Sequence, residues 1–237
     1  MRKIRTRPGL PAATTQKLQE KTGLIAQDGD AQLIYQNSRD TQWFSPVIEA
    51  LKVMAGPGGC CMLCSRSEGS DVEHYRPKAI FPNLAMTWEN YLWSCAICNR
   101  AKSNRFPPDT EPGGRMLNPV EDNPWDHLFI NDLMMITPLI GADSDAYDPR
   151  GLSTRDILRL NRDALITSRR ERYTDLTGQV ESALQGYHDG KLSVENLRSL
   201  VGQLRVYPFH LDVAEYFLDG PGQSELPFRE LFELLTT

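Results

Sequence analysis

Long apolar runs are absent from this 237-residue sequence. No stretch reaches the roughly twenty apolar residues that a helix needs to cross a bilayer, which excludes a membrane-spanning protein. The basic opening M-R-K-I-R-T-R leads straight into P-G-L-P, so the charged and then apolar order of a secretory signal is missing too. We therefore expect a cytoplasmic protein.

Positive charge is scarce. The chain has 26 Lys and Arg residues against 31 Asp and Glu residues, a net charge of −5. A protein that binds nucleic acid on its own usually presents a basic surface, because phosphate contacts supply most of its affinity. Residues 60–107 carry six basic and four acidic residues, whereas residues 108–150 carry two basic and nine acidic ones. If the chain acts on nucleic acid, we expect residues 60–107 to do so and a partner to supply much of the grip.

Cysteine is sparse and clustered. The five cysteines form two groups, Cys60, Cys61 and Cys64 in the first and Cys95 and Cys98 in the second. In a cytoplasmic protein such spacing favours metal ligands over disulfides. Cys61 and Cys64, with Cys95 and Cys98, make two C-x-x-C turns that supply the tetrahedral thiolate shell of a structural zinc site. Cys60 offers only a poorer C-x-x-x-C and is interpreted as a bystander. A redox role for either pair is disfavoured because no βαβ pattern flanks it.

Two short strands and a helix are expected between and after the cysteine pairs. Residues 71–75 alternate like a strand, and residues 90–94 indicate a second one. The residues after Cys95 predict a helix that places Asn99 and Lys102 one turn apart on one face. Folding this helix over the two strands would bring Asn99 towards the first strand.

Residues of the first strand carry candidate chemistry. Glu73 and His74 put a carboxylate beside an imidazole, and Asn99 would approach them from the helix. Oxygen ligands of this kind suit Mg²⁺, and a histidine that binds no metal can serve as a general base. The pattern therefore predicts a magnesium site, distinct from the zinc site, beside a proton acceptor.

The two motifs E-H-Y-R-P and N-Y-L-W-S-C-A-I-C-N-R-A-K together resemble the HNH endonuclease motif of the ββα-metal fold, in the version held by four cysteines. The resemblance implies His74 as the general base and Asn90 as the asparagine that braces the loop between the strands. It also implies Glu73 and Asn99 as ligands of the catalytic Mg²⁺, for which Mn²⁺ can substitute. Many members have aspartate where this chain has Glu73, which alters the expected metal geometry.

The flanking phrases R-M-L-N-P-V-E-D-N-P-W-D-H-L and L-R-L-N-R-D-A-L narrow the resemblance to the PtuB family, the HNH subunits of Septu-type anti-phage defence. That resemblance implies a nuclease effector that works with a PtuA-type ATPase and hydrolyses phosphodiester bonds of DNA to leave 5′ phosphates. Arg76, Arg100 and Lys102 are the candidate phosphate contacts. The residues leave two alternatives open, which are RNA such as tRNA as the substrate and a zinc-stapled binding module without catalysis.

The expected fold is α+β with helix predominating. We expect an N-terminal arm over residues 1–43 with a short helix at 15–21, a helix and zinc-stapled HNH core over 44–110, and an irregular connection followed by helices over 111–237. The remaining histidines, His127, His188 and His210, are expected to be structural. The run Arg169, Arg170 and Arg172 is expected on an exposed helix face.

Overall fold

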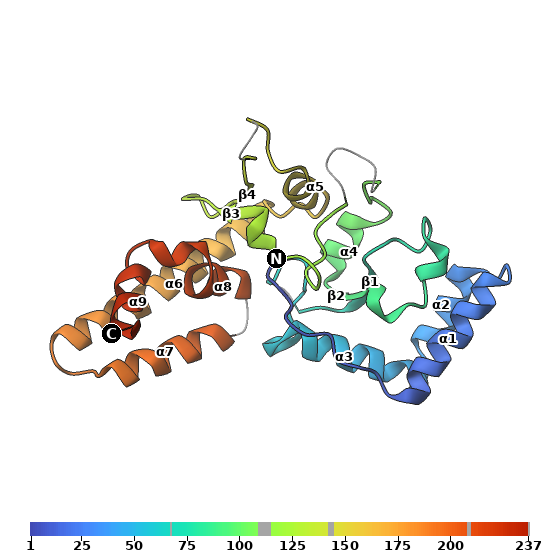
Figure 1. Ribbon diagram of the computed structural model, residues 1–237, viewed down its shortest axis with the longest axis horizontal. Helices are drawn as coiled ribbons and strands as arrows, with labels where there is room; N and C mark the ends of the chain where they lie inside the picture. The colour runs from blue at the N-terminus through green and yellow to red at the C-terminus, as the bar shows by residue number, and fades with distance from the viewer. Residues whose placement is uncertain (67, 109–114, 142–144, 208–209, 237) are drawn as a thin grey trace.

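Figure 1 shows the computed structural model, which describes residues 1–66, 68–108, 115–141, 145–207 and 210–236. The helices are α1 Ala12–Ala26, α2 Ala31–Arg39, α3 Ser45–Ala55, α4 Ala96–Lys102, α5 Pro149–Ile157, α6 Asp163–His188, α7 Val194–Val206, α8 Leu211–Asp219 and α9 Phe228–Thr236. The strands are β1 Asp71–His74, β2 Tyr91–Ser94, β3 Leu128–Ile130 and β4 Ile136–Pro138. The predicted α+β fold with helix predominating is confirmed. Within the described ranges no helix combines the length and the apolar character needed to cross a membrane.

The first half of the chain is organised around the β1–β2 hairpin (Figure 1). The two strands pair antiparallel, with Asp71 opposite Ser94 and His74 opposite Tyr91. Helix α3 packs on β2 and α4 on β1. Because α4 begins two residues after β2 ends, the chain forms strand, strand and helix in the order expected from the sequence.

Local sequence signals set the ends of α3. Ser45 and Pro46 occupy its first turn, where proline is tolerated because its missing N–H would have no helical partner. Val47 and Leu51 face the core with no exposed surface. Gly56 ends the helix with φ of +78°, a conformation that glycine adopts without strain.

The N-terminal segment contains more helix than the sequence predicted. The short helix expected at 15–21 extends over α1, and α2 follows it. The buried residues of α2 are Ala31, Tyr35 and Ser38, and Ile34 packs against the core at the same helical spacing, but this period is only nine residues long and is easily missed in the sequence. Its clearest local signal is Asp30, whose carboxylate accepts a hydrogen bond from the Leu33 N–H.

The connection between α4 and α5 was expected to be irregular, but it contains the antiparallel pair β3–β4, with Leu128 opposite Pro138. Each strand has three residues, too few for alternation to be seen. Part of this connection, at residues 109–114, lies outside the described residues.

Helices α6 to α9 form the second half of the molecule, beside the first (Figure 1). The prediction that Arg169 and Arg172 lie on an exposed face is wrong, because Arg169 has no exposed surface and Arg172 only 6%. Arg169 donates to the carbonyl of Leu160 and contacts the buried carboxylate of Asp212. Buried charges of this kind need partners, which these contacts supply.

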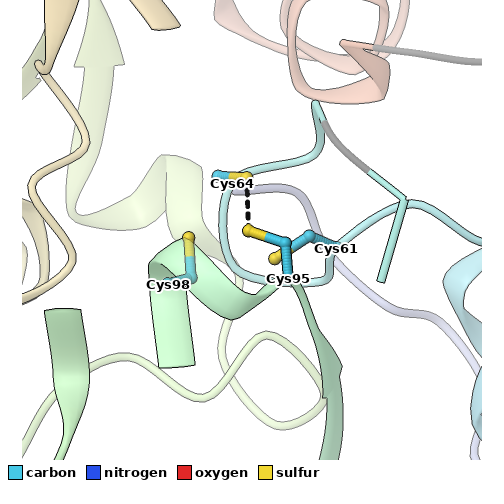
Figure 2. Close-up of side chains that lie close together, drawn as sticks. All are labelled: Cys61, Cys64, Cys95 and Cys98. Carbon is cyan, nitrogen blue, oxygen red and sulfur yellow. Dashed lines mark hydrogen bonds between the residues drawn. The ribbon is translucent and has the colours of Figure 1, made fainter. Parts of the chain in front are cut away.

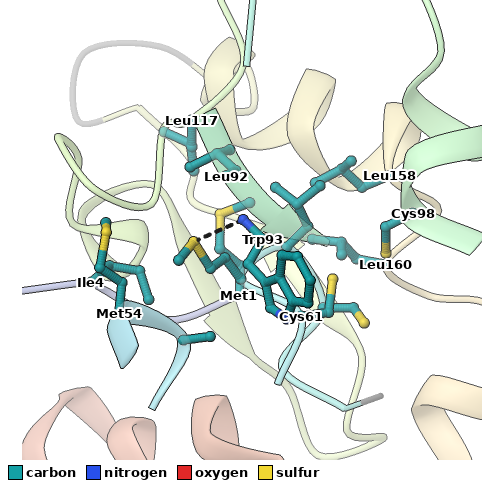
Figure 3. Close-up of a cluster of buried hydrophobic side chains, with 14 of the residues drawn as sticks. Met1, Ile4, Met54, Cys61, Leu92, Trp93, Cys98, Leu117, Leu158 and Leu160 are labelled. Carbon is teal, nitrogen blue, oxygen red and sulfur yellow. Dashed lines mark hydrogen bonds between the residues drawn. The ribbon is translucent and has the colours of Figure 1, made fainter. Parts of the chain in front are cut away.

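The two halves share one buried core. Figure 3 shows where side chains from three parts of the sequence meet, beside Cys61 and Cys98. They come from the first residues of the chain, from β2 and from the turn at residues 158–160. Within this core the backbone N–H of Trp93 donates to the sulfur of Met62 at 3.3 Å, which fixes the turn that carries Cys61 against β2.

Candidate functional site

Four cysteines converge at the end of the hairpin (Figure 2). Cys61 and Cys64 lie in the turn after α3, and Cys95 and Cys98 lie at the start of α4. All four are buried, and their sulfur atoms lie within 4.8 Å of one another. The Cys64 and Cys95 sulfurs are 3.9 Å apart, far beyond the roughly 2.05 Å of a disulfide.

The sulfur positions suit a single tetrahedral ion. Four thiolates about 2.3 Å from zinc stand about 3.8 Å from each other, close to the 3.9 Å between Cys64 and Cys95. Among the described residues, this is the one convergent group of at least three Cys, His, Asp or Glu side chains. Cys60 is not part of it, because its thiol donates to the carbonyl of Pro57 at 3.5 Å. The four predicted ligands thus form a cluster that could hold a metal.

A cation from the second half of the molecule lies against this cluster. Arg162 precedes α6 and donates from Nη2 to the Cys98 sulfur at 3.7 Å. Burial lowers the pKa of Arg162, but the negative charges of Cys98 and Cys64 outweigh it and raise the pKa above its ordinary value. The guanidinium is therefore placed to offset the negative charge of thiolates.

Glu73 forms a buried ion pair with Lys102. The Lys102 ammonium, at the end of α4, lies 2.7 Å from Glu73 Oε1 and also donates to the carbonyl of His74 at 2.7 Å. The lysine side chain has no exposed surface and that of Glu73 has 7%. Burial raises the pKa of Glu73 and lowers that of Lys102, while each partner's charge opposes the shift. The structure thus gives Lys102 an internal contact, where the sequence suggested a phosphate.

His74 is buried on the other side of β1. Its Nε2 lies 2.9 Å from the carbonyl oxygen of Ala85, which can only accept, so Nε2 carries the proton and Nδ1 the lone pair. The rings of Tyr35, from α2, and Tyr91 meet the imidazole edge-on at 4.6 and 5.2 Å. Burial lowers the pKa of His74 to about 3, which keeps the imidazole neutral at pH 7.

Successive side chains of a strand point to opposite faces, and β1 follows this rule. Glu73 points to α4 and His74 to Ala85 and α2. The sequence placed their functional groups side by side, but the contacts of the two groups lie on opposite faces of β1.

Asn90 ties together the loop between the strands. Its Oδ1 accepts from the N–H of Arg76, and its Nδ2 donates to the carbonyls of Arg76 and Leu84, at 2.8 to 3.0 Å. Asn90 is 4% exposed, so these bonds satisfy its buried amide. The amide therefore fixes the path of the chain just after His74.

The remaining predicted residues surround the hairpin. Asn99 is half-buried on α4, one turn before Lys102, and Arg100 is exposed. The Arg76 guanidinium lies over the rings of Phe81 and Phe106, at 5.2 and 5.5 Å. The structure thus does not gather Arg76 and Arg100 with Lys102 on one surface.

Two further cations near the site were missed by sequence reasoning. The ammonium of Lys78 lies 5.1 Å from the centre of the Tyr35 ring, and burial lowers its pKa while Glu73 opposes that shift. Arg39, at the end of α2, lies 4.0 Å from Asp71. Lys78 directly follows the E-H-Y-R-P motif and could have been found there, whereas nothing in the sequence placed Arg39 near β1.

Comparison with known proteins gives two similar curated chains, both called Septu protein PtuB. The one from Bacillus thuringiensis is 29% identical over 157 residues, which cover 64% of this chain and 56% of the relative. The one from Bacillus mycoides is 34% identical over 105 residues, which cover 33% of this chain and 36% of the relative. The matched regions thus span about half and about a third of these relatives' lengths. No family model and no solved structure matches the chain.

Proposed function

We propose that this chain is an HNH-type endonuclease that hydrolyses phosphodiester bonds of DNA, as the nuclease component of a Septu-type anti-phage defence system. Two observations support the proposal. The chain is similar to proteins named Septu protein PtuB. Its Glu73–His74 pair lies on a β-hairpin that runs into a helix at a four-cysteine cluster. A PtuA-type ATPase is the proposed partner, and it would supply the nucleic-acid grip that an acidic chain lacks.

The observation that carries the nuclease proposal is the tautomer of His74, which is neutral with its proton on Nε2. A general base must be unprotonated at working pH and present a lone pair. His74 meets both conditions, because burial keeps the ring neutral and its Nε2 proton is directed to Ala85, which leaves Nδ1 the lone pair. A pKa of about 3 also makes the buried ring a weak base, so the proposed proton transfer requires His74 to be re-exposed, which brings its pKa back towards the ordinary value. In the proposed reaction Nδ1 takes a proton from water as the water oxygen bonds to phosphorus. The bond from phosphorus to the 3′ oxygen breaks, and the 3′ oxygen takes a proton from solvent water, which leaves a 3′ hydroxyl and a 5′ phosphate.

Zinc is the proposed occupant of the cysteine cluster. Four thiolates complete a tetrahedral shell, so the ion keeps no open position for a substrate and its role is structural. It would join Cys61 and Cys64 to Cys95 and Cys98 and so hold α4 against the hairpin. Binding of structural zinc by small domains is worth about 10–16 kcal/mol, enough to order a polar segment.

The Mg²⁺ predicted from the sequence does not fit the described conformation. Glu73 offers one carboxylate and Asn99 one amide oxygen, but the Lys102 ammonium already occupies Glu73 Oε1 at 2.7 Å. A divalent cation there would meet a like charge at short range. We therefore assign no step to Mg²⁺. Divalent-cation dependence remains a prediction, and it requires Lys102 to leave Glu73.

Access to His74 also requires movement. The imidazole is 4% exposed and is covered by Tyr35 of α2. A phosphodiester can reach Nδ1 only after α2 is displaced, which nucleic acid or the ATPase partner would bring about. The same burial favours a second candidate function, a zinc-stapled binding module in which Glu73 and His74 are structural.

A phage challenge separates the two functions. Cells carrying the chain with a PtuA-type ATPase are infected, and His74→Ala is compared with the matched control His188→Ala, since His188 is exposed and distant from β1. The nuclease proposal predicts loss of protection for His74→Ala alone, with zinc content and circular dichroism unchanged. Full protection by a folded, zinc-loaded His74→Ala protein favours the binding module.

A further inference from the structure

A cavity of about 530 Å³ opens where the turn after Cys64 meets the C-terminal helices. Its lining residues come from that turn, from α6 and from the two sides of the α7–α8 connection, and they are Arg66, Ser168, Glu171, Arg172, Asp175, Tyr207 and His210. Small-molecule sites usually occupy about 300–1,000 Å³, so the cavity has the size of a ligand pocket. It shares no residue with the candidate nuclease site.

Buried polar atoms without partners gather at this cavity. Of seven such side-chain atoms in the described part of the chain, four belong to Ser65, Arg172 and His210. His210 is 3% exposed, and its Nδ1 lies 3.5 Å from Asp212 Oδ1, within the range of an ion pair, so Nε2 is the ring nitrogen that has no group of the described residues near it as a partner. Ser65 is adjacent, because its carbonyl accepts from the His210 N–H. Buried groups of this kind usually have a partner, so their concentration here points to a ligand or bound water.

The donors among the orphaned atoms favour an acceptor ligand. Arg172 Nε is a donor, and the Ser65 hydroxyl and His210 ring can also donate. Of the two carboxylates, Asp175 already accepts from Arg172 Nη1 at 2.7 Å and from Gln179 at 3.0 Å. Glu171 is exposed. Arg66 adds a second cation at the wall of the cavity.

An aromatic surface lies beside these donors. The Arg172 guanidinium stacks over the Tyr207 ring at 4.8 Å, and Tyr207 is 52% exposed. A second planar group can therefore stack on the open part of the ring, as nucleobases do on aromatic side chains. Arg172 offers only Nε to a phosphate of the same ligand, because Nη1 donates to Asp175 and Nη2 to the carbonyl of Leu204. Arg66 supplies the second cation for that phosphate.

We propose that this cavity is a mononucleotide site, with the phosphate held by Arg66, Arg172 and His210 and the base on Tyr207. A ligand there would contact both the turn of the cysteine cluster and α6, and so would stabilise the interface between the two halves of the molecule. The site is independent of the proposed nuclease activity, because a mononucleotide contains no diester bond to cleave.

Calorimetry and thermal unfolding of the full chain test the site with AMP, adenosine and inorganic phosphate as probes. AMP at 100 times its Kd should raise Tm by about 5–10 °C. It should bind at least about tenfold more tightly than adenosine, because the phosphate gains charge-assisted hydrogen bonds. Equal affinity for AMP and adenosine overturns the phosphate site, and equal affinity for AMP and phosphate overturns the role of Tyr207.

Two variants locate the ligand. Arg66→Gln should weaken AMP binding about tenfold or more. The matched control Arg159→Gln, which changes an exposed arginine outside the cavity, should bind AMP within about twofold of wild type. Absence of AMP binding to wild type, or identical affinities of the two variants, refutes the proposal. Since Arg66 is only half-buried, its substitution should leave the fold intact, which the unliganded Tm checks.

Discussion

The Glu73–Lys102 pair gives the sharpest energetic prediction. Replacing Lys102 with Met keeps the length of the side chain but leaves Glu73 without its partner in a site with 7% exposure. Breaking a buried pair by removing one charge costs about 3–5 kcal/mol, because the other charge remains desolvated. The His74 carbonyl loses a donor as well. For a domain of this size each kcal/mol lowers Tm by about 2–4 °C, so Tm should fall by about 6–20 °C.

An exposed pair of the same geometry provides the control. Lys17 and Glu20 are also 2.7 Å apart, but their side chains are 48% and 45% exposed. Lys17→Met should therefore cost less than about 1 kcal/mol. The double variant Glu73→Gln, Lys102→Met leaves no unpaired charge and should recover much of the lost stability. Scanning calorimetry at pH 7 measures all four proteins. A Tm for Lys102→Met within about 2 °C of that of Lys17→Met would refute the reasoning.

Three further predictions concern the cysteine cluster and His74. Cys95→Ser should lose its zinc by elemental analysis, whereas Cys60→Ser should keep it, since Cys60 lies outside the cluster; equal retention by both contradicts the assignment. Arg162→Gln should weaken zinc binding about tenfold in competition with a chelator, and unchanged affinity would show that its contact with Cys98 is incidental. The pKa of His74 is about 3 in the folded protein and about 6.5 in the unfolded chain. The buried neutral imidazole therefore makes its full contribution to the free energy of unfolding above pH 6.5, and this contribution is lost as the pH falls towards 3. Between pH 6 and 4 wild type should therefore lose up to about 1.4 kcal/mol per pH unit more than His74→Gln in urea titrations, and parallel curves would contradict the low pKa.

Local signals were enough to predict the elements that carry the site. The helix before the first cysteine pair, the strand at β1 and the helix that begins at the second C-x-x-C all appear in the structure at the expected places. The convergence of the four cysteines was predictable because each pair is confined to a short turn. Such features depend on residues close together in the sequence.

The features that the sequence did not reveal depend on distant residues. Lys102 was predicted to contact phosphate, because its burial depends on the carboxylate of Glu73, 29 residues earlier. The cover that Tyr35 places over His74 comes from α2, a helix of nine residues that contacts a strand almost forty residues later in the sequence. Arg169 can be buried because its guanidinium forms an ion pair with the carboxylate of Asp212, on α8. Charged residues in a helical pattern are usually exposed, so burial with a remote partner is invisible in a single sequence.

Plasmid cleavage is the most direct measurement of the central claim that the hairpin carrying His74 cuts nucleic acid. Wild type and His74→Gln, each loaded with zinc and mixed with a PtuA-type ATPase and Mg²⁺, are incubated with supercoiled DNA, and the ends are analysed. The amide of the substituted side chain would keep a donor for the Ala85 carbonyl but offers no comparable base. We predict nicked or linear DNA with 5′ phosphates for wild type and a rate at least about 100-fold lower for His74→Gln. Equal rates for the two proteins would contradict the account.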